Sequence, residues 1–181
     1  MTSTSDLLQT AAGDSAAFER LIAAEQARVF GFLGRMGLDA ATSEDIAQDA
    51  FLRVWRNAKS FDPRLSAAST WILTIARNLA LTHLSRSSQR REVNNDEAAA
   101  RALCGAPLAD EALEQKQQRA RLDAALRRLA AAERSILAAS YVEGLDLASI
   151  ARIEGCSTGA AKVRLHRARA KLKRMLEQED G

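Results

Sequence analysis

Apolar residues recur every three or four positions along most of the N-terminal half, which is the spacing of amphipathic helices. Gly37 is placed to end the first helix, and Ser43 to cap the second. The three predicted helices run from about Asp14 to Met36, from Ser43 to about Lys59, and from Ser69 or Thr70 to about Arg86. The predicted buried stripe of the second helix consists of Ile46, Ala47, Ala50, Phe51, Val54 and Trp55. This half therefore predicts a bundle of three or four helices.

The C-terminal half shows the same spacing in shorter segments. Its predicted helices contain Leu122 to Leu129, Ile136 to Val142 with Gly144 at the end, Leu147 to Ile153, and Ser157 to about Gln178. Between the halves, residues 87–113 have no sustained period and contain Pro107, which is typical of a linker. We therefore predict an all-α protein with two small helical domains, residues 1–88 and 115–181, joined by a flexible linker over residues 89–114.

A short helix, a turn at Gly155 and Cys156, and a long final helix are typical of helix-turn-helix DNA-binding proteins. One apolar stripe follows the final helix through Ala161, Leu165, Ala168, Leu172 and Met175. Its other faces are cationic, because seven Lys or Arg residues and no acidic residue lie between Lys162 and Arg174. Such a helix can enter the major groove with phosphate contacts on both sides. The residues placed to reach bases are Thr158, Lys162, His166 and Arg167.

The composition of the chain argues against several classes of protein. Only 4% of the 181 residues are aromatic and two are proline, which disfavours an all-β fold. No apolar stretch is long enough to span a bilayer, so we expect a cytoplasmic protein without membrane insertion. Cys104 and Cys156 lie far apart with no ligand spacing around them, which suggests neither a disulfide nor a metal site. With two histidines and no Gly-rich phosphate loop, we also expect no catalytic centre and no cofactor.

The formal net charge of +3 conceals an uneven distribution. Six acidic residues and one arginine lie between Glu92 and Glu114, so the predicted linker is acidic while the segment after it is basic. When fully extended, a linker of about 25 residues spans roughly 80 Å, which is longer than two turns of duplex DNA. The predicted linker can therefore span that distance.

Two polar rows occur on the predicted N-terminal helices. Asp45, Gln48 and Asp49 lie on one face of the second helix. On the third helix, Thr74, Asn78 and Thr82 form a row with Arg77 beside it. Each row is either a solvated face or a binding surface, and spacing alone leaves both readings open.

Three ordered blocks resemble the bacterial sigma-70 family, specifically its small extracytoplasmic-function (ECF) group. The blocks are SEDIAQDAFLRVWR over residues 43–56, similar to region 2.2; TWILTIARNLAL over 70–81, similar to regions 2.3 and 2.4; and EGLDLASIAR over 143–152 with KVRLHRAR over 162–169, similar to region 4.2. The resemblance covers nearly the whole chain. It implies that residues 1–88 form sigma region 2, that residues 115–181 form region 4, and that the chain is a promoter-specificity subunit of RNA polymerase.

The resemblance also implies a role for each surface. The segment that docks on the polymerase β′ subunit is matched by Asp45, Gln48, Asp49, Phe51 and Arg53. The surface that binds the −10 element and helps to open DNA is matched by Arg64, Thr74, Arg77, Asn78 and Thr82, with Asn78 and the loop over residues 62–69 holding a flipped base. The surface that reads the −35 element is matched by Thr158, Lys162, Arg164, His166 and Arg167.

The implied partners are core RNA polymerase, through its β′ and β subunits, promoter DNA, and an anti-sigma factor. The variant AASTW over residues 67–71 is similar to a branch controlled by zinc-binding anti-sigma factors. One alternative is a stand-alone helix-turn-helix repressor or activator, which would bind an operator without polymerase. A hydrolase or transferase is a more distant alternative, because the chain offers little from which to build a catalytic site.

Overall fold

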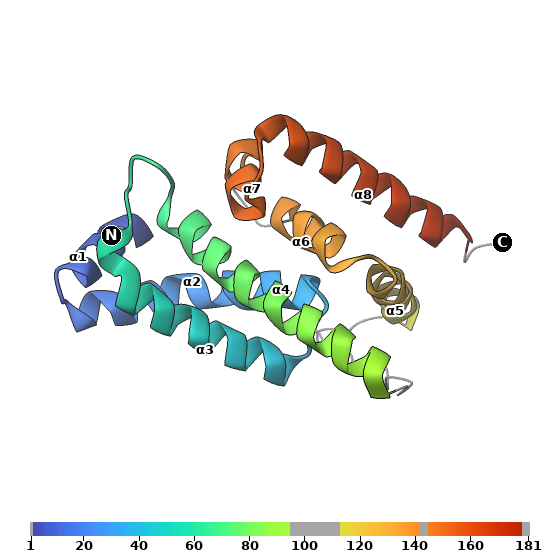
Figure 1. Cartoon of the computed structure of the whole chain (residues 1–181), viewed down its shortest axis with the longest axis horizontal. Coiled ribbons are helices and arrows are strands. Elements are labelled where there is room, and N and C mark those ends of the chain that lie inside the picture. The colour runs from blue at the N-terminus through green and yellow to red at the C-terminus, as the bar shows by residue number, and fades with distance from the viewer. Residues whose placement is uncertain (1, 95–112, 142–144, 179–181) are drawn as a thin grey trace.

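The computed structural model describes residues 2–94, 113–141 and 145–178. Over these residues the chain forms α-helices and one short 3-10 helix, without a strand, so the all-α prediction is confirmed (Figure 1). The helices are α1 (Ser3–Ala11), α2 (Ser15–Arg35), α3 (Ala40–Asn57), α4 (Ala68–Asn94), α5 (Leu113–Arg127), α6 (Ala131–Ser140), α7 (Leu147–Glu154) and α8 (Thr158–Gln178), with the 3-10 turn at Ala58–Ser60.

Helices α1 to α4 form the N-terminal half, a bundle built on the apolar stripes that the sequence predicts. Leu21 and Leu33 of α2, Val54 of α3 and Ile72 of α4 are fully buried in its core. Asp14 caps α2 by accepting a hydrogen bond from the backbone N–H of Ala17 at 3.1 Å. The first predicted helix is therefore confirmed almost to the residue at both ends.

Helix α1 was not predicted, since the first predicted helix begins at about Asp14. Its Leu7 is fully buried, and its Asp6 accepts a hydrogen bond from Arg20 of α2 at 3.0 Å. The hydroxyl of Thr4 accepts from the backbone N–H of Ala68 at 3.4 Å. This short helix thus contacts both α2 and the first residue of α4.

Two predicted helix starts were wrong. Helix α3 is capped by Asp39, whose carboxylate accepts from the Thr42 N–H at 2.8 Å, and Ser43 is buried within the helix. Helix α4 likewise begins at Ala68, so neither Ser69 nor Thr70 caps it, and Thr70 is buried. The predicted stripe on α3 is correct except at Trp55, which is 38% exposed.

The ends of the two helices that flank the predicted linker also differ from the prediction. Helix α4 continues past Arg86 to Asn94, and α5 begins at Leu113, so both ends of the predicted linker are helical. Residues 95–112 of that linker lie outside the described residues, as does the predicted end of α6 at Val142 to Gly144.

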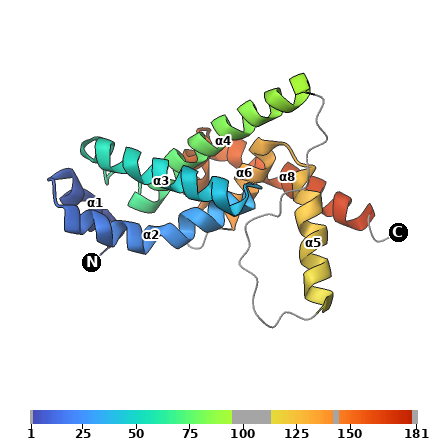
Figure 2. The same cartoon turned by 90° about the horizontal axis from the view of Figure 1, so that it is seen from below.

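Helices α5 to α8 form the C-terminal half. The apolar stripe of α8 packs inward as predicted, with Ala161, Leu165, Ala168 and Leu172 buried. Helices α6 and α7 pack on α4, and α6 also contacts α2, so one hydrophobic core runs through both halves (Figures 1 and 2). Across the described ranges, no helix is both long and apolar enough to cross a membrane.

Candidate functional site

The helix-turn-helix unit comprises α7, a short turn and α8. The Asp146 carboxylate caps α7 by accepting from the Ser149 N–H at 2.7 Å, and this hydrogen bond holds the pKa of Asp146 below its ordinary value. Gly155 ends α7 at φ +62°, a left-handed conformation that favours glycine. The Ser157 hydroxyl then accepts from the Ala160 N–H at 3.2 Å and so caps α8, at the residue where the final helix was predicted to start.

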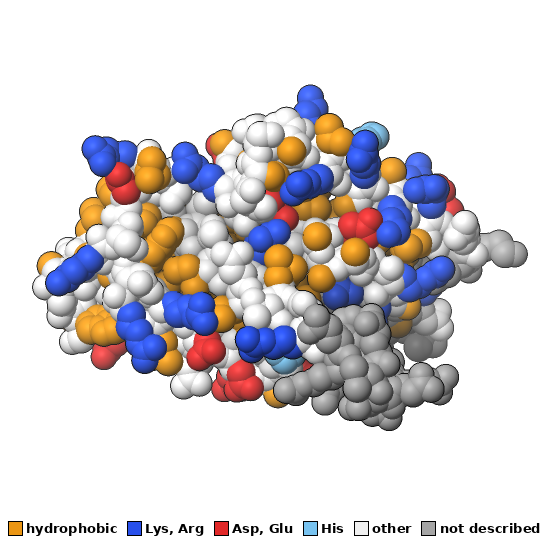
Figure 3. Space-filling view, viewed as in Figure 1, with side chains coloured by type: hydrophobic (Ala, Val, Ile, Leu, Met, Phe, Trp, Pro, Cys, Tyr) orange, Lys and Arg blue, Asp and Glu red, His pale blue; other side chains and the backbone are white. Residues whose placement is uncertain are grey.

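The predicted base-contacting residues all lie on the exposed faces of α8. Lys and Arg side chains follow this helix on the surface shown in Figure 3. The exposed members of the predicted set are Thr158, Lys162, Arg164, His166 and Arg167. With its apolar stripe buried, α8 therefore offers its remaining faces to a polyanion, as a helix that enters a DNA groove must do.

An ion pair fixes α8 against α6. The Nζ of Lys171 lies 2.8 Å and 3.0 Å from the two carboxylate oxygens of Glu133. Glu133 also accepts from the Ala130 N–H at 2.8 Å, which caps the start of α6. Burial raises the pKa of Glu133, but the hydrogen bonds from Lys171 and Ala130 outweigh it, so the pKa lies below its usual value.

Two residues of the predicted polar row on α4 are exposed at the surface. Asn78 and Thr82 are exposed and Thr74 is half-buried. The Thr74 and Thr82 hydroxyls donate to the carbonyls of Thr70 and Asn78 respectively, each at 2.8 Å, which leaves their lone pairs available as acceptors. The Asn78 side chain is therefore the most accessible amide donor and acceptor of the row.

The loop before α4 holds its own polar pair. Arg64 donates to the Asp62 carboxylate, with 2.6 Å between Nη2 and Oδ2, and this contact lowers the pKa of Asp62 and raises that of Arg64. Phe61 and Trp71 pack with ring centroids 5.5 Å apart beneath the loop. Leu65 of the same loop is 59% exposed, and no role was predicted for it.

Arg77 departs from the rest of its row. Its guanidinium points into the C-terminal half, where it lies 2.8 Å from a carboxylate oxygen of Glu154, and the side chain is only 12% exposed. In this structure, Arg77 is not placed on the free surface of α4.

The predicted polymerase-binding residues of α3 divide into two groups. Asp45, Gln48, Asp49 and Arg53 are exposed, whereas Phe51 is 7% exposed and packs in the core. The prediction that Phe51 contacts a partner is therefore not supported by its position, and it instead holds α3 in place.

Two exposed apolar residues accompany this polar row. Leu52 is 44% exposed and follows Asp45, Gln48 and Asp49 at helical spacing on the same face. Trp55 is also exposed, and its ring lies 4.9 Å from that of Phe18. Polar residues around exposed Leu and Trp are typical of a protein-binding surface. Neither residue was predicted to be part of this surface, although Leu52 follows Asp49 by three positions and so continues the polar row.

Two protein-family models match the chain, in the expected order. The Sigma-70 region 2 family matches residues 21–91, and the Sigma-70, region 4 family matches residues 119–172. Together they cover all of α3, most of α2 and α4, and most of α5 to α8. The structural divisions and the family matches therefore agree.

Similar proteins give the same result. The chain is 32% identical over 164 residues to the ECF RNA polymerase sigma factor RpoE of Cereibacter sphaeroides, covering 88% of this chain and 86% of that protein. It is 35% identical over 166 residues to the RNA polymerase sigma factor CarQ of Myxococcus xanthus, covering 91% of each.

Solved structures share the fold. The structure of CnrH in complex with the cytosolic domain of CnrY matches with a TM-score of 0.70 and 23% identity, over 97% of this chain and 98% of that one. The sigma factor RpoE of Bartonella quintana, in complex with the anti-sigma factor NepR, matches with a TM-score of 0.71 and 22% identity, over 88% and 96%. From the two region matches and these relatives, the chain belongs to the sigma-70 family as an ECF sigma factor, a subunit for promoter-specific transcription initiation by RNA polymerase.

Proposed function

We propose that this sigma factor uses three separate surfaces, on α3, α4 and α8, to join core polymerase to promoter DNA. It supplies no catalytic group of its own, because RNA polymerase carries out the chemistry. The observation that carries the proposal is α8, whose apolar stripe is buried while Thr158, Lys162, His166 and Arg167 share its exposed side. A helix of this kind in a helix-turn-helix unit suits the major groove.

The α8 surface is proposed to read the −35 duplex. His166 and Lys162 lie one helical turn apart, so they reach neighbouring base pairs in the groove. Arg164 and Arg167 flank this row and suit phosphate or guanine contacts. The ion pair between Lys171 and Glu133 keeps the second half of α8 against its own domain, which leaves the first half for DNA.

The α4 surface and the loop before it are proposed to bind the −10 element and help to open it. Asn78 offers one amide acceptor and two donors, which suits the Watson–Crick edge of an unpaired base. Arg64 is exposed in the loop and can contact the backbone of the displaced strand. Extrusion of a base costs a few kcal/mol, so contacts from the loop, α4 and core polymerase together must offset it.

The α3 surface is proposed to bind core polymerase through its β′ and β subunits. Asp45 and Asp49 supply negative charge, and Leu52 and Trp55 supply the apolar contacts that give such an interface its affinity. An anti-sigma factor, of the zinc-binding kind by the AASTW segment, is the expected regulator, and it would cover one or more of these surfaces. Because polymerase and promoters lie in the bacterial cytoplasm, we place the protein there.

Transcription from a random promoter library tests the proposal. Purified core polymerase is assayed with the wild-type chain, without it, and with Arg167→Ala, and the start sites are sequenced. We expect new start sites only with the chain, sharing two short motifs about two duplex turns apart. Start sites unchanged by the chain would contradict the proposal. Tight sequence-specific binding without polymerase would instead support a stand-alone repressor or activator.

A further inference from the structure

Arg77 joins the two halves through a buried polar cluster. Its Nη2 lies 2.8 Å from Oε2 of Glu154 and its Nε lies 3.2 Å from Oε1. The same Nε donates to the hydroxyl of Ser135 on α6 at 3.0 Å, and that hydroxyl donates to Glu154 at 2.5 Å. The side chain of Glu154 is 2% exposed, and Ser135 is fully buried. Helices α6 and α7 both pack on α4 (Figure 1).

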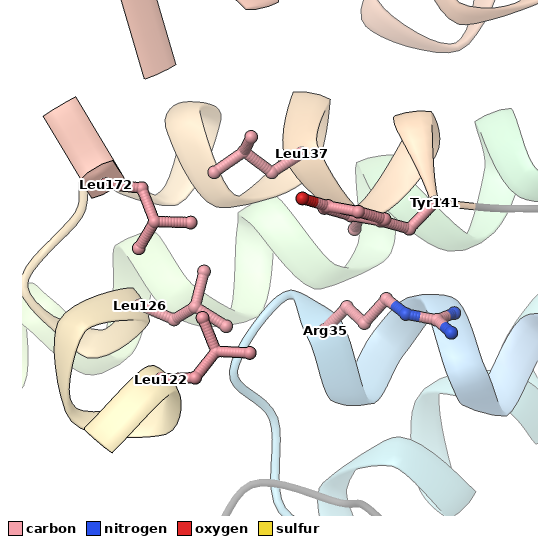
Figure 4. A pocket seen from close by; sticks show the side chains of 7 residues that line it. Arg35, Leu122, Leu126, Leu137, Tyr141 and Leu172 are labelled. Atoms are coloured by element: carbon pink, nitrogen blue, oxygen red, sulfur yellow. The ribbon is translucent and has the colours of Figure 1, made fainter. Parts of the chain in front are cut away.

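A second contact between the halves lies at the end of α2. Arg35 borders an open apolar pocket of about 170 Å³, whose other lining residues come from α5, α6 and α8 (Figure 4). These are Leu122, Leu126, Leu137, Ala138, Tyr141 and Leu172. An incompletely filled apolar contact holds two units less firmly than a close-packed one. The buried cluster around Arg77 therefore adds directional hydrogen bonds to the apolar packing of α6 and α7 on α4.

The cluster also uses the surface assigned to the −10 element. Arg77 precedes Asn78 on α4, and its Nη1 donates to Oδ1 of Asn78 at 3.3 Å. A helix packed over Arg77 excludes a DNA strand from that position. The hydrogen bond from Arg77 also uses one of the two lone pairs of the Asn78 amide oxygen. Carboxylates and phosphates both accept two hydrogen bonds from one guanidinium, so Glu154 takes the place that a phosphate would take.

We propose that the free chain holds itself closed through Arg77 and Glu154, so that its own helix-turn-helix unit masks part of the −10 surface. This inference rests on the proposed role of α4. The competing partner is an anionic DNA backbone, which binds Arg77 only after Glu154 has left. Binding that requires the open form draws the equilibrium toward it, so core polymerase or promoter DNA can release the contact.

The strength of a buried ion pair suits such a reversible contact. Its attraction is largely offset by the loss of hydration of both charges, so an intact pair adds little net stability. Breaking it from one side, however, leaves a buried charge without a partner, which is strongly unfavourable. Charge reversal at Glu154 should therefore open the chain, and reversal of both charges should close it again.

Fluorescence energy transfer within the full-length chain tests closure. Dyes are placed through unnatural amino acids at Gln26 on α2 and Gln178 on α8, which are exposed. We expect Glu154→Arg to lower the transfer efficiency, with the ratio of open to closed chains rising roughly tenfold or more. Arg77→Glu combined with Glu154→Arg should restore the wild-type efficiency. The matched control is Glu177→Arg, an exposed acid on α8, which should change nothing.

Circular dichroism checks that each variant keeps its helices. Wild-type efficiency in folded Glu154→Arg would overturn the proposal, and so would failure of the double variant to restore closure. If Glu154→Arg alone does not fold, recovery of both fold and efficiency in the double variant supports the pairing of these two residues, and recovery of neither overturns it.

Masking of the −10 surface is tested with the variant Glu154→Gln. This substitution removes the negative charge of Glu154 but keeps an acceptor for Ser135. The probe is a labelled single strand carrying the −10 motif found in the promoter library, and its binding to free chain is followed by fluorescence anisotropy. We expect Glu154→Gln to bind more tightly than wild type and Glu177→Gln to bind equally. Equal binding by Glu154→Gln and wild type would overturn masking. The dye measurement needs neither polymerase nor promoter. Its result on closure is therefore independent of whether the proposed promoter function is correct.

Discussion

Lys171 on α8 and Glu133 on α6 form a half-buried ion pair in which one carboxylate also caps α6. The pair therefore couples the orientation of the DNA-binding helix to the start of the helix beneath it. Because the ion pair with Lys171 needs the ionised carboxylate, this coupling depends on pH.

We predict that the stability of the Glu133→Gln variant falls less than that of wild type as the pH is lowered. The folded pKa of Glu133 is lowered, so its contribution is complete above its ordinary value of 4.5 and is lost as pH falls toward the folded value. The difference in Tm between wild type and Glu133→Gln should be largest at neutral pH and shrink below pH 4.5. Glu177→Gln, whose pair with Lys173 spans 3.6 Å at the surface, is the control. Parallel Tm curves for wild type and Glu133→Gln would contradict the coupling.

Two glycines of the helix-turn-helix unit should respond oppositely to alanine. Gly155 adopts φ +62°, so Gly155→Ala should destabilise the protein by about 1–2 kcal/mol, although the added Cβ meets no atom within 4 Å. Gly159 lies in α8 without a positive φ and also has open space around it, so Gly159→Ala should stabilise by about 0.5–1 kcal/mol. Urea unfolding of both variants measures the difference. Stabilisation by Gly155→Ala would show that the turn does not depend on the left-handed residue.

Asp49→Arg should weaken binding to core polymerase by about tenfold or more, because it reverses a charge in the middle of the α3 surface. Asp49 is exposed, so the fold should be unaffected. Competition for core against a labelled sigma factor gives the affinity. Glu177→Arg carries the same charge change on α8 and should bind as wild type does. Loss of binding in both variants would point to overall charge rather than to the α3 surface.

Arg167→Ala should reduce transcription from promoters with an intact −35 element by about tenfold, the value of one good base or phosphate contact. The control is Arg174→Ala, which removes an exposed arginine from the same helix near its C-terminal end, where the side chain bonds to the Ala170 carbonyl. Mutation of the −35 element should abolish the difference between wild type and Arg167→Ala. Equal activity of the two proteins on the intact promoter would reject this role.

Asn78→Ala should impair DNA opening more than closed-complex binding, because an extruded base loses its hydrogen-bonding partner. Permanganate reactivity of unpaired thymines reports opening, and a mobility shift at low temperature reports closed-complex binding. His83→Ala removes an exposed side chain from another face of α4 and serves as the control. A permanganate footprint like that of wild type would remove Asn78 from the proposed pocket.

The apolar stripes of α2, α3 and α8 could be predicted from the sequence because burial repeats with the helical period. Helix starts were harder. Ser43 precedes Glu44 and Asp45 as an N-cap often does, yet the carboxylate of Asp39 caps the helix one turn earlier and draws Ser43 into the interior. Several residues able to cap lie close together here, and only the packing of the helix decides among them.

The exposed surface of α3 was predicted only in part. Its polar residues follow from spacing, but exposed Leu52 and Trp55 look like core residues in the sequence. The contact between Arg77 and Glu154 lies beyond such reasoning altogether, since it joins side chains 77 positions apart through the packing of two halves. Local patterns set which residues face inward, whereas long-range partners depend on the assembled fold.

Helix α1 reaches beyond its own place in the bundle. Through Thr4 it accepts the N–H of Ala68, directly after the loop that carries Arg64 and Leu65. Deleting residues 2–11, or fusing a rigid tag close to them, would free one end of that loop although none of these residues is expected to touch DNA. Because Leu7 of α1 is also fully buried in the core, such a truncation would destabilise the bundle as well as the loop, so studies of initiation need the N-terminal helix intact.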